Sequence, residues 1–546
     1  MPKIVLEHVT KRWGNYYGVD DLNLVIDDNS FVTLLGPSGC GKTTTLRMIA
    51  GLETPTSGKI TIGDRVVFDS EMGINVPASK RRVGFLFQNY ALWPNMTVYK
   101  NISFGLKNIK EDMPSYDYEY VMHKTLARLL SSPEEIVSTV TDCIDQKGKL
   151  DDKKALVRLI DAFDISMITA KVLFGFKLHE VPADGLEAKI AALIDNENKA
   201  AEALIAKHAA KGLELTEDGE LKKDGESIIT NRRLDKEELD LAVRRSSRKV
   251  KIGEFMDRYP AELSGGQQQR VAIARTLAPA PTVLFMDEPL SNLDAKLRLE
   301  MRSELQRLHI TTGSTFVYVT HDQLEAMTLA TKICLINNGV LQQYEPPLDI
   351  YYRPNNLFVA DFIGNPSINL IEAKAVQKEA GKLELSFFED TKANFVFNEK
   401  IDLEAYHQEL GETLAREAAK EAEDKANGKV EKSNKDKPFK YHVQRVEEPR
   451  KKDHIDLTHE DVVIGVRPEF ISFDKNGQFE GTIYSAMPAG METTVKIRIG
   501  NYLLTGVIFG GVSYKIDEKI RFNITGTDIL IYDRKTTRVI GEGHIG

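Results

Sequence analysis

The sequence has few cysteines and little tryptophan. Its three cysteines, Cys40, Cys143 and Cys334, are widely separated and odd in number. This pattern excludes a disulfide framework and a cysteine-based zinc cluster, and a reducing cytoplasm is its simplest explanation. The 72 lysines and arginines do not outnumber the 81 acidic residues, and the net charge is -9. Nucleic acid is therefore not an expected partner.

Long apolar runs are also missing. No window approaches the roughly 18 to 20 apolar residues that a membrane span needs. The first residues, MPKIVLEHVTKRW, alternate like a β-strand and lack the apolar core of a signal peptide. If the protein works at a membrane, we expect it to do so through partner subunits. With 546 residues, of which 42% are hydrophobic, the chain is long enough for two or three globular domains.

A glycine-rich loop stands near the start of the chain. GPSGCGKT follows the apolar run FVTLLG and leads into TTTLRMIAGL, so the order is strand, loop and helix. The loop fits G-x-x-x-x-G-K-[ST], in which backbone N–H groups surround phosphates. Lys42 would reach the β and γ oxygens, and the Thr43 hydroxyl would bind Mg²⁺. The predicted ATP-binding residues in this loop are Gly36, Pro37, Ser38, Gly39, Cys40, Gly41, Lys42, Thr43 and Thr44.

A second candidate phosphate site lies more than two hundred residues later. LSGGQQQR, residues 263–270, precedes the helical run VAIARTLA. Free N–H groups at a helix start, the positive end of its dipole and small side chains favour phosphate binding. The predicted contacts are Leu263, Ser264, Gly265, Gly266 and Gln267.

Acidic residues end a third apolar run, TVLFMDEP. Asp287 is placed to hold Mg²⁺ through water, and Glu288 to orient an attacking water, because phosphoryl transfer depends on positioning and charge neutralisation. His321 ends STFVYVTH and would act as a neutral imidazole near a γ-phosphate. The alternatives are a solvated strand edge for the acids and a structural role for the histidine.

Two further side chains are candidates on weaker grounds. Gln88, in FLFQNYALWP, would contact Mg²⁺ or water. Trp13, in KRWGNYY, would stack on adenine, and Tyr16 or Tyr17 could replace it. Ordinary loop and packing roles remain alternatives for all four.

The chain alternates between regions of different pattern. Residues 1–110 contain short strands, whereas residues 110–235 contain amphipathic helices and a charged connector, KGLELTEDGELKKDGE. From about residue 370 short strands return, interrupted by LAREAAKEAEDKANGKVEKSNKDKP, which predicts a solvated helix or disorder. We expect an ATPase domain over 1–370 and an all-β domain over 371–546, with a charged insertion at about 400–455.

These motifs occur in one order that resembles the ATP-binding cassette of ABC transporters. The stretches QNYALWPNMTVYKNISFGL, DEPLSNLDAKLRLEMRSEL and VTHDQLEAMTLA are similar to the ATPase subunits of maltose-type sugar and glycerol-phosphate importers. The resemblance implies an α/β P-loop NTPase with a RecA-like core, an ABC β-subdomain and a helical subdomain at about 90–275. It also implies a C-terminal OB-type regulatory domain, to which VIGVRPEFI and LIYDRKTTRVI are similar.

The resemblance also implies roles for the candidates. Two cassettes would enclose ATP head to tail, so that Lys42 of one copy and Ser264 of the other touch the same γ-phosphate. Glu288 would be the general base, His321 a switch, and Asp294 of SNLD would lie at the dimer seam. Catalysis would thus involve Glu288, His321 and Gln88, with Thr43, Gln88 and Asp287 at the metal.

The implied partners are a second copy or a homologous cassette, two integral-membrane permeases and, indirectly, a substrate-binding protein or lipoprotein. Residues 90–104 would form the groove for a permease coupling helix at the cytoplasmic face of the membrane. ATP hydrolysis would then drive import of a sugar or glycerol phosphate. A polyamine or ion importer is an alternative within the family, and a soluble ABC ATPase without a permease is an alternative outside transport.

The sequence departs from this subgroup in several places. Residues 111–235 form a large extra segment inside the helical subdomain, either a decoration without direct role or a docking module for a regulator. Gln268 stands where many relatives carry arginine, and Phe470 where many carry histidine. These two changes leave the phosphate chemistry untouched and concern regulatory contacts.

Overall fold

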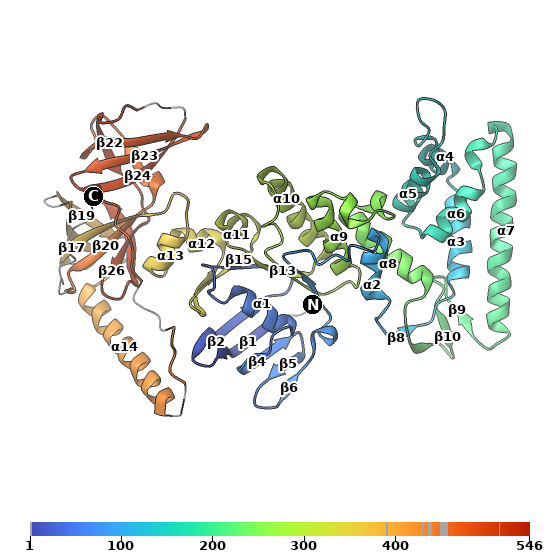
Figure 1. Cartoon of the computed structure of the whole chain (residues 1–546), viewed down its shortest axis with the longest axis horizontal. Helices are drawn as coiled ribbons and strands as arrows, with labels where there is room; N and C mark the ends of the chain where they lie inside the picture. The colour runs from blue at the N-terminus through green and yellow to red at the C-terminus, as the bar shows by residue number, and fades with distance from the viewer. Residues whose placement is uncertain are drawn as a thin grey trace. The chain divides into compact units, whose positions relative to one another are not determined.

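The computed structural model describes residues 3–388, 391–426, 428, 430–434, 439–447, 457–510, 512 and 514–546. The chain divides into two compact units (Figure 1). The terminal unit comprises Met1–Arg81 with Thr315–Gly546, and the central unit comprises Arg82–Ser314. Each unit holds part of the predicted nucleotide machinery.

The terminal unit contains most of the strands. Its helices are α1 (Lys42–Ala50), α11 (Gln323–Leu329), α12 (Pro347–Tyr352), α13 (Leu357–Phe362) and α14 (Leu403–Ala426), with 3-10 turns at Ala78–Lys80 and Pro468–Phe470. Its strands are β1 (Ile4–Trp13), β2 (Tyr16–Ile26), β3 (Phe31–Leu35), β4 (Ser57–Ile62), β5 (Arg65–Asp69), β6 (Ile74–Asn75), β14 (Thr315–Val319), β15 (Lys332–Asn337), β16 (Val340–Glu345), β17 (Asn369–Glu379), β18 (Lys382–Phe387), β19 (Thr391–Phe397), β20 (Asp461–Val466), β21 (Ile471–Phe473), β22 (Phe479–Pro488), β23 (Glu492–Ile499), β24 (Tyr502–Phe509), β25 (Lys519–Ile524), β26 (Ile529–Asp533) and β27 (Val539–Ile545).

Two sheets in this unit frame the glycine-rich loop. Strands β16, β15, β3 and β14 lie in that order, and β15 and β14 run parallel to β3. Every residue of β3 and β14 is buried, which explains their continuous apolar sequences. The second sheet is antiparallel, in the order β2-β1-β4-β5-β6. The strands expected within MPKIVLEHVTKRW and in FVTLLG are therefore confirmed as β1 and β3.

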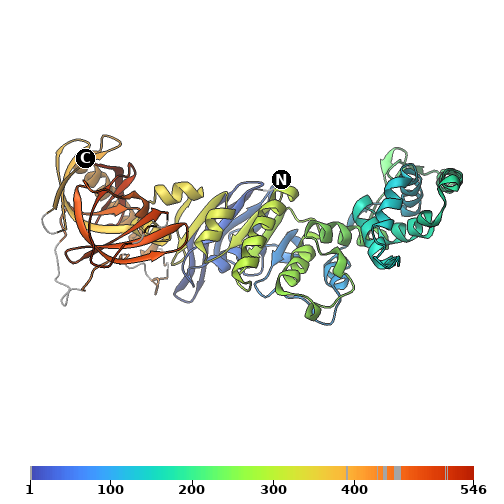
Figure 2. The same cartoon turned by 90° about the horizontal axis from the view of Figure 1, so that it is seen from above.

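The last part of the terminal unit is all β, as expected. Strands β17-β18-β19-β27-β26-β20 close a barrel, and β21-β25-β22-β23-β24 form a five-stranded sheet (Figure 2). One apolar core serves both, since Phe395, Ile464 and Ile531 of the barrel cluster with Val495 and Phe522 of the sheet. The predicted charged interruption is helical over α14, which agrees with the helix alternative.

The central unit is mainly helical. Its helices are α2 (Val98–Leu106), α3 (Tyr118–Leu130), α4 (Pro133–Thr141), α5 (Asp152–Phe163), α6 (Met167–Gly175), α7 (Ala183–Ala209), α8 (Lys236–Lys249), α9 (Gly265–Leu277) and α10 (Ala295–Thr312), with 3-10 turns at Leu178–Glu180, Gly253–Phe255 and Pro260–Glu262. Its strands are β7 (Val83–Leu86), β8 (Glu111–Pro114), β9 (Glu214–Leu215), β10 (Leu221–Lys223), β11 (Glu226–Ser227), β12 (Ile229–Arg232) and β13 (Val283–Asp287). Strands β7 and β13 pair in parallel.

The two ends of the extra segment, residues 111–235, lie next to each other in the central unit. Strand β8 begins it and β12 ends it, and the two pair antiparallel from Glu111 with Arg232 to Pro114 with Ile229. Between them α3 to α7 enclose a core of their own, in which Leu126, Leu159 and Leu173 are buried. The predicted charged connector, KGLELTEDGELKKDGE, contains short strands, because backbone pairing orders part of it into the small sheet β11-β10-β9.

Candidate nucleotide site

The glycine-rich loop joins β3 to α1 in the terminal unit. Its glycines have positive φ, 149° at Gly36, 77° at Gly39 and 106° at Gly41. A Cβ at Gly36 would lie 2.1 Å from Ile336 O, and one at Gly41 would lie 2.2 Å from Gly18 O. At Gly39 a Cβ would meet nothing within 4 Å. Gly36 and Gly41 therefore allow neighbouring backbone to pack closely against the loop. Gly39 has open space around it, where phosphate would approach the backbone.

Lys42 is held inside this loop. Its ammonium donates to Gly36 O at 2.7 Å and to Pro37 O at 2.8 Å, and it lies 3.8 Å from Cys40 Sγ. The side chain is 6% exposed. Burial raises the pKa of the Cys40 thiol, while the nearby Lys42 charge opposes that rise. A buried cation at the start of α1, whose N-cap is a glycine without a capping side chain, makes the loop a suitable anion site.

Trp13 lies at the tip of the hairpin formed by β1 and β2. Its side chain is 48% exposed, its ring centroid is 6.5 Å from that of Tyr16, and Lys11 Nζ lies 5.1 Å from its ring. Tyr17 is only 3% exposed, and its hydroxyl donates to Val430 O at 2.9 Å. Of the three aromatic candidates, Trp13 and Tyr16 therefore present open rings, and Tyr17 does not.

His321 follows β14 directly and is exposed. Asp322, the next residue, caps α11 by accepting from the backbone N–H of Leu324 at 2.8 Å and of Glu325 at 3.3 Å. The cap fixes the turn that carries the imidazole. The sequence placed His321 at this strand end, and the structure agrees.

The second phosphate motif begins α9 in the central unit. Ser264 and Gln267 form a capping box: Ser264 Oγ accepts from Gln267 N at 3.4 Å, and Gln267 Oε1 accepts from Ser264 N at 2.9 Å. A Cβ on Gly266 would lie 2.7 Å from Leu297 Cδ2, whereas one on Gly265 would lie 3.9 Å from Leu293. A side chain at position 266 would thus require Leu297, at the start of α10, to shift, whereas one at position 265 would fit without a shift.

The acidic motif ends β13 in the same unit. Asp287 is buried in the strand, and Glu288 has a φ of 45°, which is rare for a residue with a side chain. Gln88 Nε2 donates to Glu288 Oε2 at 3.3 Å and to Ser291 Oγ at 3.4 Å. Asn292 Nδ2 donates to Gln88 O at 3.0 Å. The structure therefore brings together Gln88 and Glu288, which are 200 residues apart.

Asp294 caps α10, since its carboxylate accepts from Leu297 N at 2.9 Å. Leu297 is the residue against which Gly266 packs. The predicted dimer-seam residue and the predicted trans phosphate motif are therefore neighbours within the central unit. Gln268 also has a local role, because its side-chain amide donates to Pro260 O at 3.0 Å and to Leu263 O at 3.2 Å.

The predicted partner groove contains a cluster of aromatic rings. The centroids of Trp93 and Phe104 are 4.2 Å apart, and both rings are partly exposed. Arg275 of α9 donates to Tyr90 O at 2.7 Å and to Ala91 O at 2.6 Å, and its guanidinium lies 5.3 Å from the Trp93 ring. Burial lowers the pKa of Arg275. This arginine holds the groove to α9, and no sequence motif indicated it.

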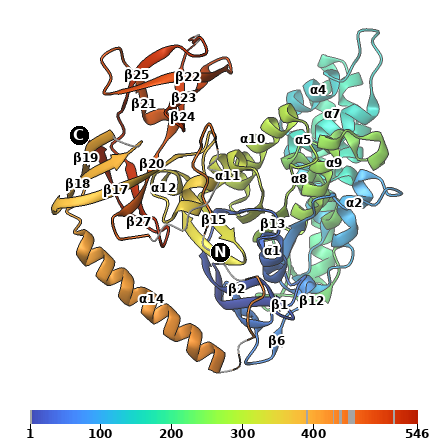
Figure 3. The ribbon, with the colours of Figure 1, turned by 60° about the vertical axis from the view of Figure 1, so that its left-hand side comes forward.

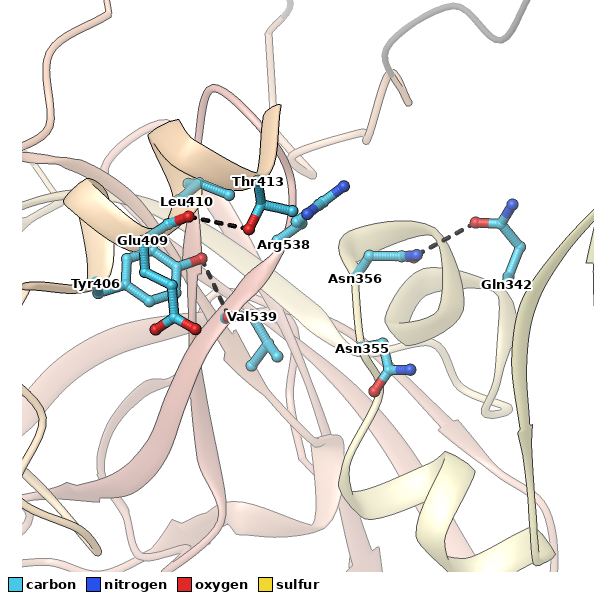
Figure 4. Close-up of a pocket in the computed structure, with 9 residues that line it drawn as sticks. All are labelled: Gln342, Asn355, Asn356, Tyr406, Glu409, Leu410, Thr413, Arg538 and Val539. Atoms are coloured by element: carbon cyan, nitrogen blue, oxygen red, sulfur yellow. Dashed lines mark hydrogen bonds between the residues drawn. The ribbon is translucent and has the colours of Figure 1, made fainter. Parts of the chain in front are cut away.

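A cavity of about 480 Å³ in the terminal unit lies beside α14 (Figure 4). It is lined by Gln342, Asn355, Asn356, Tyr406, Glu409, Leu410, Thr413, Arg538 and Val539. None of the predicted ATP-binding or catalytic residues lines it.

Comparison with known proteins agrees with the motifs. The model of the ABC transporter family matches residues 19–166 and 184–291. An sn-glycerol-3-phosphate import ATP-binding protein of Brucella abortus is 35% identical over 374 residues, which cover 68% of this chain and 70% of that protein. The chain belongs to the ABC transporter family. It is an ABC ATPase, and the expected α/β fold with a C-terminal all-β domain is confirmed.

Other relatives of this ABC protein differ in their named solutes. A trehalose/maltose import ATP-binding protein of Thermococcus litoralis is 35% identical over 373 residues, covering 68% of this chain and 67% of that protein. A spermidine/putrescine import ATP-binding protein of Aster yellows witches'-broom phytoplasma is 37% identical over 377 residues, covering 69% and 76%. The family match includes the glycine-rich loop, the second phosphate motif and the acidic motif.

Two findings concern membranes and metals. No helix in the part of the chain that the structure describes has the length and apolarity of a bilayer span. Over the same residues, no group of three or more His, Cys, Asp or Glu side chains is arranged to hold a metal ion. The predicted magnesium ligands are instead a hydroxyl, an amide and one carboxylate. These are hard oxygen donors that suit an ion which keeps water and phosphate oxygens as ligands.

Proposed function

We propose that this ABC ATPase dimerises around two ATP molecules and drives the import of a sugar or glycerol phosphate through two membrane-embedded permeases. The observation that carries the proposal is the identity of about 35% to sugar and glycerol-phosphate import subunits, which extends over 68% of the chain. The same relatives support a place at the cytoplasmic face of the membrane. A substrate-binding protein or lipoprotein would deliver the solute to the permeases.

The phosphates would bind the loop from Gly36 to Thr44, with Lys42 neutralising charge at the β and γ oxygens. Lys42 already lies inside the loop between two carbonyl oxygens, so little reorganisation is needed to receive an anion. Trp13 would stack on adenine with its exposed face. In a dimer, Leu263 to Gln267 of the second copy would complete the phosphate contacts, and Asp294 would lie at the seam.

Magnesium would be held by Thr43, Gln88 and Asp287, and would neutralise charge on the transferred phosphoryl group. Glu288 would act as general base on the attacking water. Its bond from Gln88 orients the carboxylate, and Gln88 would thereby link the metal region to the permease side. His321 would hydrogen-bond near the γ-phosphate and report whether ATP is intact.

A polyamine is the second candidate solute, and one specific observation favours it. The phytoplasma spermidine/putrescine relative is 37% identical and has 76% of its length covered. Because the solute contacts permease and binding-protein chains rather than the ATPase, this identity does not separate the two candidates.

The test is reconstitution of the complex. The tagged chain is purified from detergent-solubilised membranes of its own cells, and co-purifying multi-span proteins are identified. ATPase activity in proteoliposomes is then measured with maltose, sn-glycerol 3-phosphate or spermidine and the matching binding protein. Stimulation by the first or second supports the proposal, and stimulation by spermidine alone selects the polyamine function. A chain that stays monomeric with a non-hydrolysable ATP analogue and retains no membrane partner contradicts both.

A further inference from the structure

A short segment of the second charged region contacts the hairpin that carries Trp13. We call this segment, Val430 to Asn434, the strap. Ser433 donates to Asn15 O from its backbone N–H at 2.9 Å and from its hydroxyl at 3.0 Å. Val430 O accepts the hydroxyl hydrogen bond of Tyr17 at 2.9 Å. More than four hundred residues separate the two partners in the sequence, so the contact is tertiary.

Asn434 completes the contact by imitating a peptide group. Its Oδ1 accepts from Tyr17 N at 3.0 Å, and its Nδ2 donates to Tyr17 O at 2.8 Å. Strand β2 is at the edge of its sheet, so these backbone groups of Tyr17 face away from β1. The backbone N–H and C=O groups of an open strand edge normally bond to water. Here a side-chain amide takes the place of a neighbouring strand and bonds to them. The strap therefore extends the sheet at the tip of the Trp13 hairpin.

The strap also reaches the turn that touches the glycine-rich loop. Lys432 Nζ donates to Asn338 O at 3.3 Å and pairs with Asp20 at 3.5 Å. The next residue, Gly339, accepts from Asp20 N at 2.9 Å and donates its own N–H to Cys40 O at 2.9 Å. A continuous set of contacts thus runs from the strap through this turn to the loop that holds Lys42.

The segment before the strap is attached to the barrel. In α14, Tyr406 donates to Val539 O at 3.2 Å (Figure 4). Glu417 of the same helix pairs with Arg538 at 2.8 Å. Figure 3 shows α14 extending from the strands of the barrel toward the side of the sheet that carries β2. The strap is therefore continuous with a helix that is fixed to the regulatory domain.

The segment after the strap is attached as well. Phe439 packs edge-on against Phe358 of α13, with centroids 5.4 Å apart. Arg445 pairs with Glu372 of β17 at 3.0 Å, and its guanidinium lies 4.8 Å from the Tyr502 ring. Both flanks of the strap are thus anchored on the same unit as the hairpin, which limits the entropy lost when the strap binds.

We infer that Ser433 and Asn434 are positioning residues for adenine recognition, which hold the Trp13 hairpin in its binding conformation and connect it to the regulatory barrel. The inference rests on the proposed stacking of Trp13 on adenine. Trp13 is exposed at a hairpin tip, where its ring lies beside Tyr16 and Lys11 of the same hairpin. Edge bonds to Asn15 and Tyr17 reduce the motion of that tip, so less order has to be gained when a base binds.

The test uses the full-length chain and the variant Asn434→Ala. We measure the Kd of a non-hydrolysable ATP analogue with Mg²⁺ by calorimetry, and kcat and KM for ATP hydrolysis. The expected result is a rise of about three- to tenfold in Kd and KM, as follows from losing two neutral hydrogen bonds, with kcat unchanged within about twofold. Asn434→Asp, which keeps only the acceptor, should give a smaller rise. Glu423→Ala on the exposed face of α14 is the matched control and should change neither constant.

Two further measurements separate the inference from its premise. Trp13→Ala should raise the Kd, and Asn434→Ala should add nothing in that background if it acts through Trp13. Inorganic tripolyphosphate, which lacks a base, should bind the wild type and Asn434→Ala equally. Trp13→Ala without effect refutes adenine stacking and with it the inference. If Trp13→Ala raises the Kd for the ATP analogue but Asn434→Ala does not, the strap has no such role. The same holds if Asn434→Ala weakens tripolyphosphate binding as much as it weakens ATP binding. Either result leaves the proposed function intact.

Discussion

The side-chain nitrogen of Gln88 lies 3.3 Å from Glu288 Oε2 and 3.4 Å from Ser291 Oγ. The carboxylate that this bond orients belongs to a residue with positive φ directly after a buried strand. A conformation of this kind is retained at a cost, and such residues cluster at functional sites. The direction of the Glu288 side chain is therefore set by its own backbone conformation after β13 and by the hydrogen bond from Gln88.

The first prediction concerns this carboxylate. Glu288→Gln should bind ATP but hydrolyse it more slowly, by about 10²-fold or more, because an amide cannot accept the proton of the attacking water. Size-exclusion chromatography with Mg-ATP should show an accumulated dimer. Normal turnover in this variant would mean that another group is the base.

The second prediction concerns Lys42. Lys42→Ala should weaken ATP binding itself, because the buried ammonium is the one side-chain cation that donates to the loop carbonyls of Gly36 and Pro37 among the described contacts. Calorimetry measures this loss. Lys80→Ala, in an exposed 3-10 turn of the same unit, is the control and should bind ATP normally. An unchanged Kd in Lys42→Ala would contradict the phosphate role of the loop.

The third prediction compares two adjacent glycines. Gly266→Ala should destabilise the central unit by at most about 1 kcal/mol, because its Cβ would lie 2.7 Å from Leu297 Cδ2, the end of a side chain that must shift. Gly265→Ala has room for a Cβ and should leave the free energy of unfolding nearly unchanged. If the motif binds phosphate from the partner copy, Gly265→Ala should still lower ATPase activity. Denaturant unfolding and turnover, measured on both variants, distinguish packing from function.

The fourth prediction concerns pH and the extra segment. His208 of α7 lies 2.6 Å from Asp117, which also accepts from Tyr120 N and so caps α3. Burial acts to raise the pKa of Asp117, but the bond from His208 and the backbone N–H groups outweigh it, and the net shift is downward. The ionised carboxylate therefore stabilises the fold above its unfolded pKa, and this contribution is lost as the pH falls through the folded-state value.

The protection factors of the α3 and α7 amides, which correct for the pH dependence of intrinsic exchange, should accordingly fall on acidification. Asp117→Asn should exchange faster at neutral pH and show a weaker pH dependence. Glu119 is exposed and lies two residues after Asp117 in the chain, so Glu119→Gln should show the same pH dependence of exchange as the wild type. Identical pH profiles for Asp117→Asn and the wild type would rule out this contact as the cause.

The fifth prediction concerns the attachment of the barrel. Arg467 is 1% exposed and donates to Ile363 O at 2.5 Å, Ala360 O at 3.4 Å and Tyr351 O at 2.5 Å, with its guanidinium 4.0 Å from the Tyr351 ring. Arg467→Ala leaves these carbonyls unsatisfied and should cost about 2–4 kcal/mol of unfolding free energy. Arg521→Ala, which breaks an exposed pair with Glu480, should cost less than about 1 kcal/mol. Thermal unfolding checks both values.

The sequence predicted those features that depend on local pattern. The loop around Lys42 was evident because strand, glycines and helix follow one another directly, and His321 and Asp287 were placed at strand ends by apolar runs that stop at a polar residue. The two-stranded pairing of β8 with β12 was not predictable, because EDMP carries no strand pattern and its partner lies more than a hundred residues away.

The strap escaped prediction for a related reason. Residues 430–434 are polar and lie in a charged segment, so composition favours a solvated helix or disorder. Their contacts with Asn15 and Tyr17 include side-chain amide and hydroxyl groups that bond to an open strand edge. Contacts of this kind produce no periodic pattern in the sequence. The sequence shows that Tyr17 is aromatic, which makes it a candidate for stacking on adenine. It does not show that the side chain is buried against a distant segment.

Glu111 and Arg232 are register partners in the pairing of β8 with β12, and this has a consequence for protein design. Because the two positions adjoin, a tight turn could join them in a variant that omits the residues between them. The helical lobe that such a variant would omit encloses a core of its own. The shortened polypeptide would lack more than a hundred residues, and α8 would lose its contacts with the lobe, among them Arg248 with Asp161 and Asp240 with Met167.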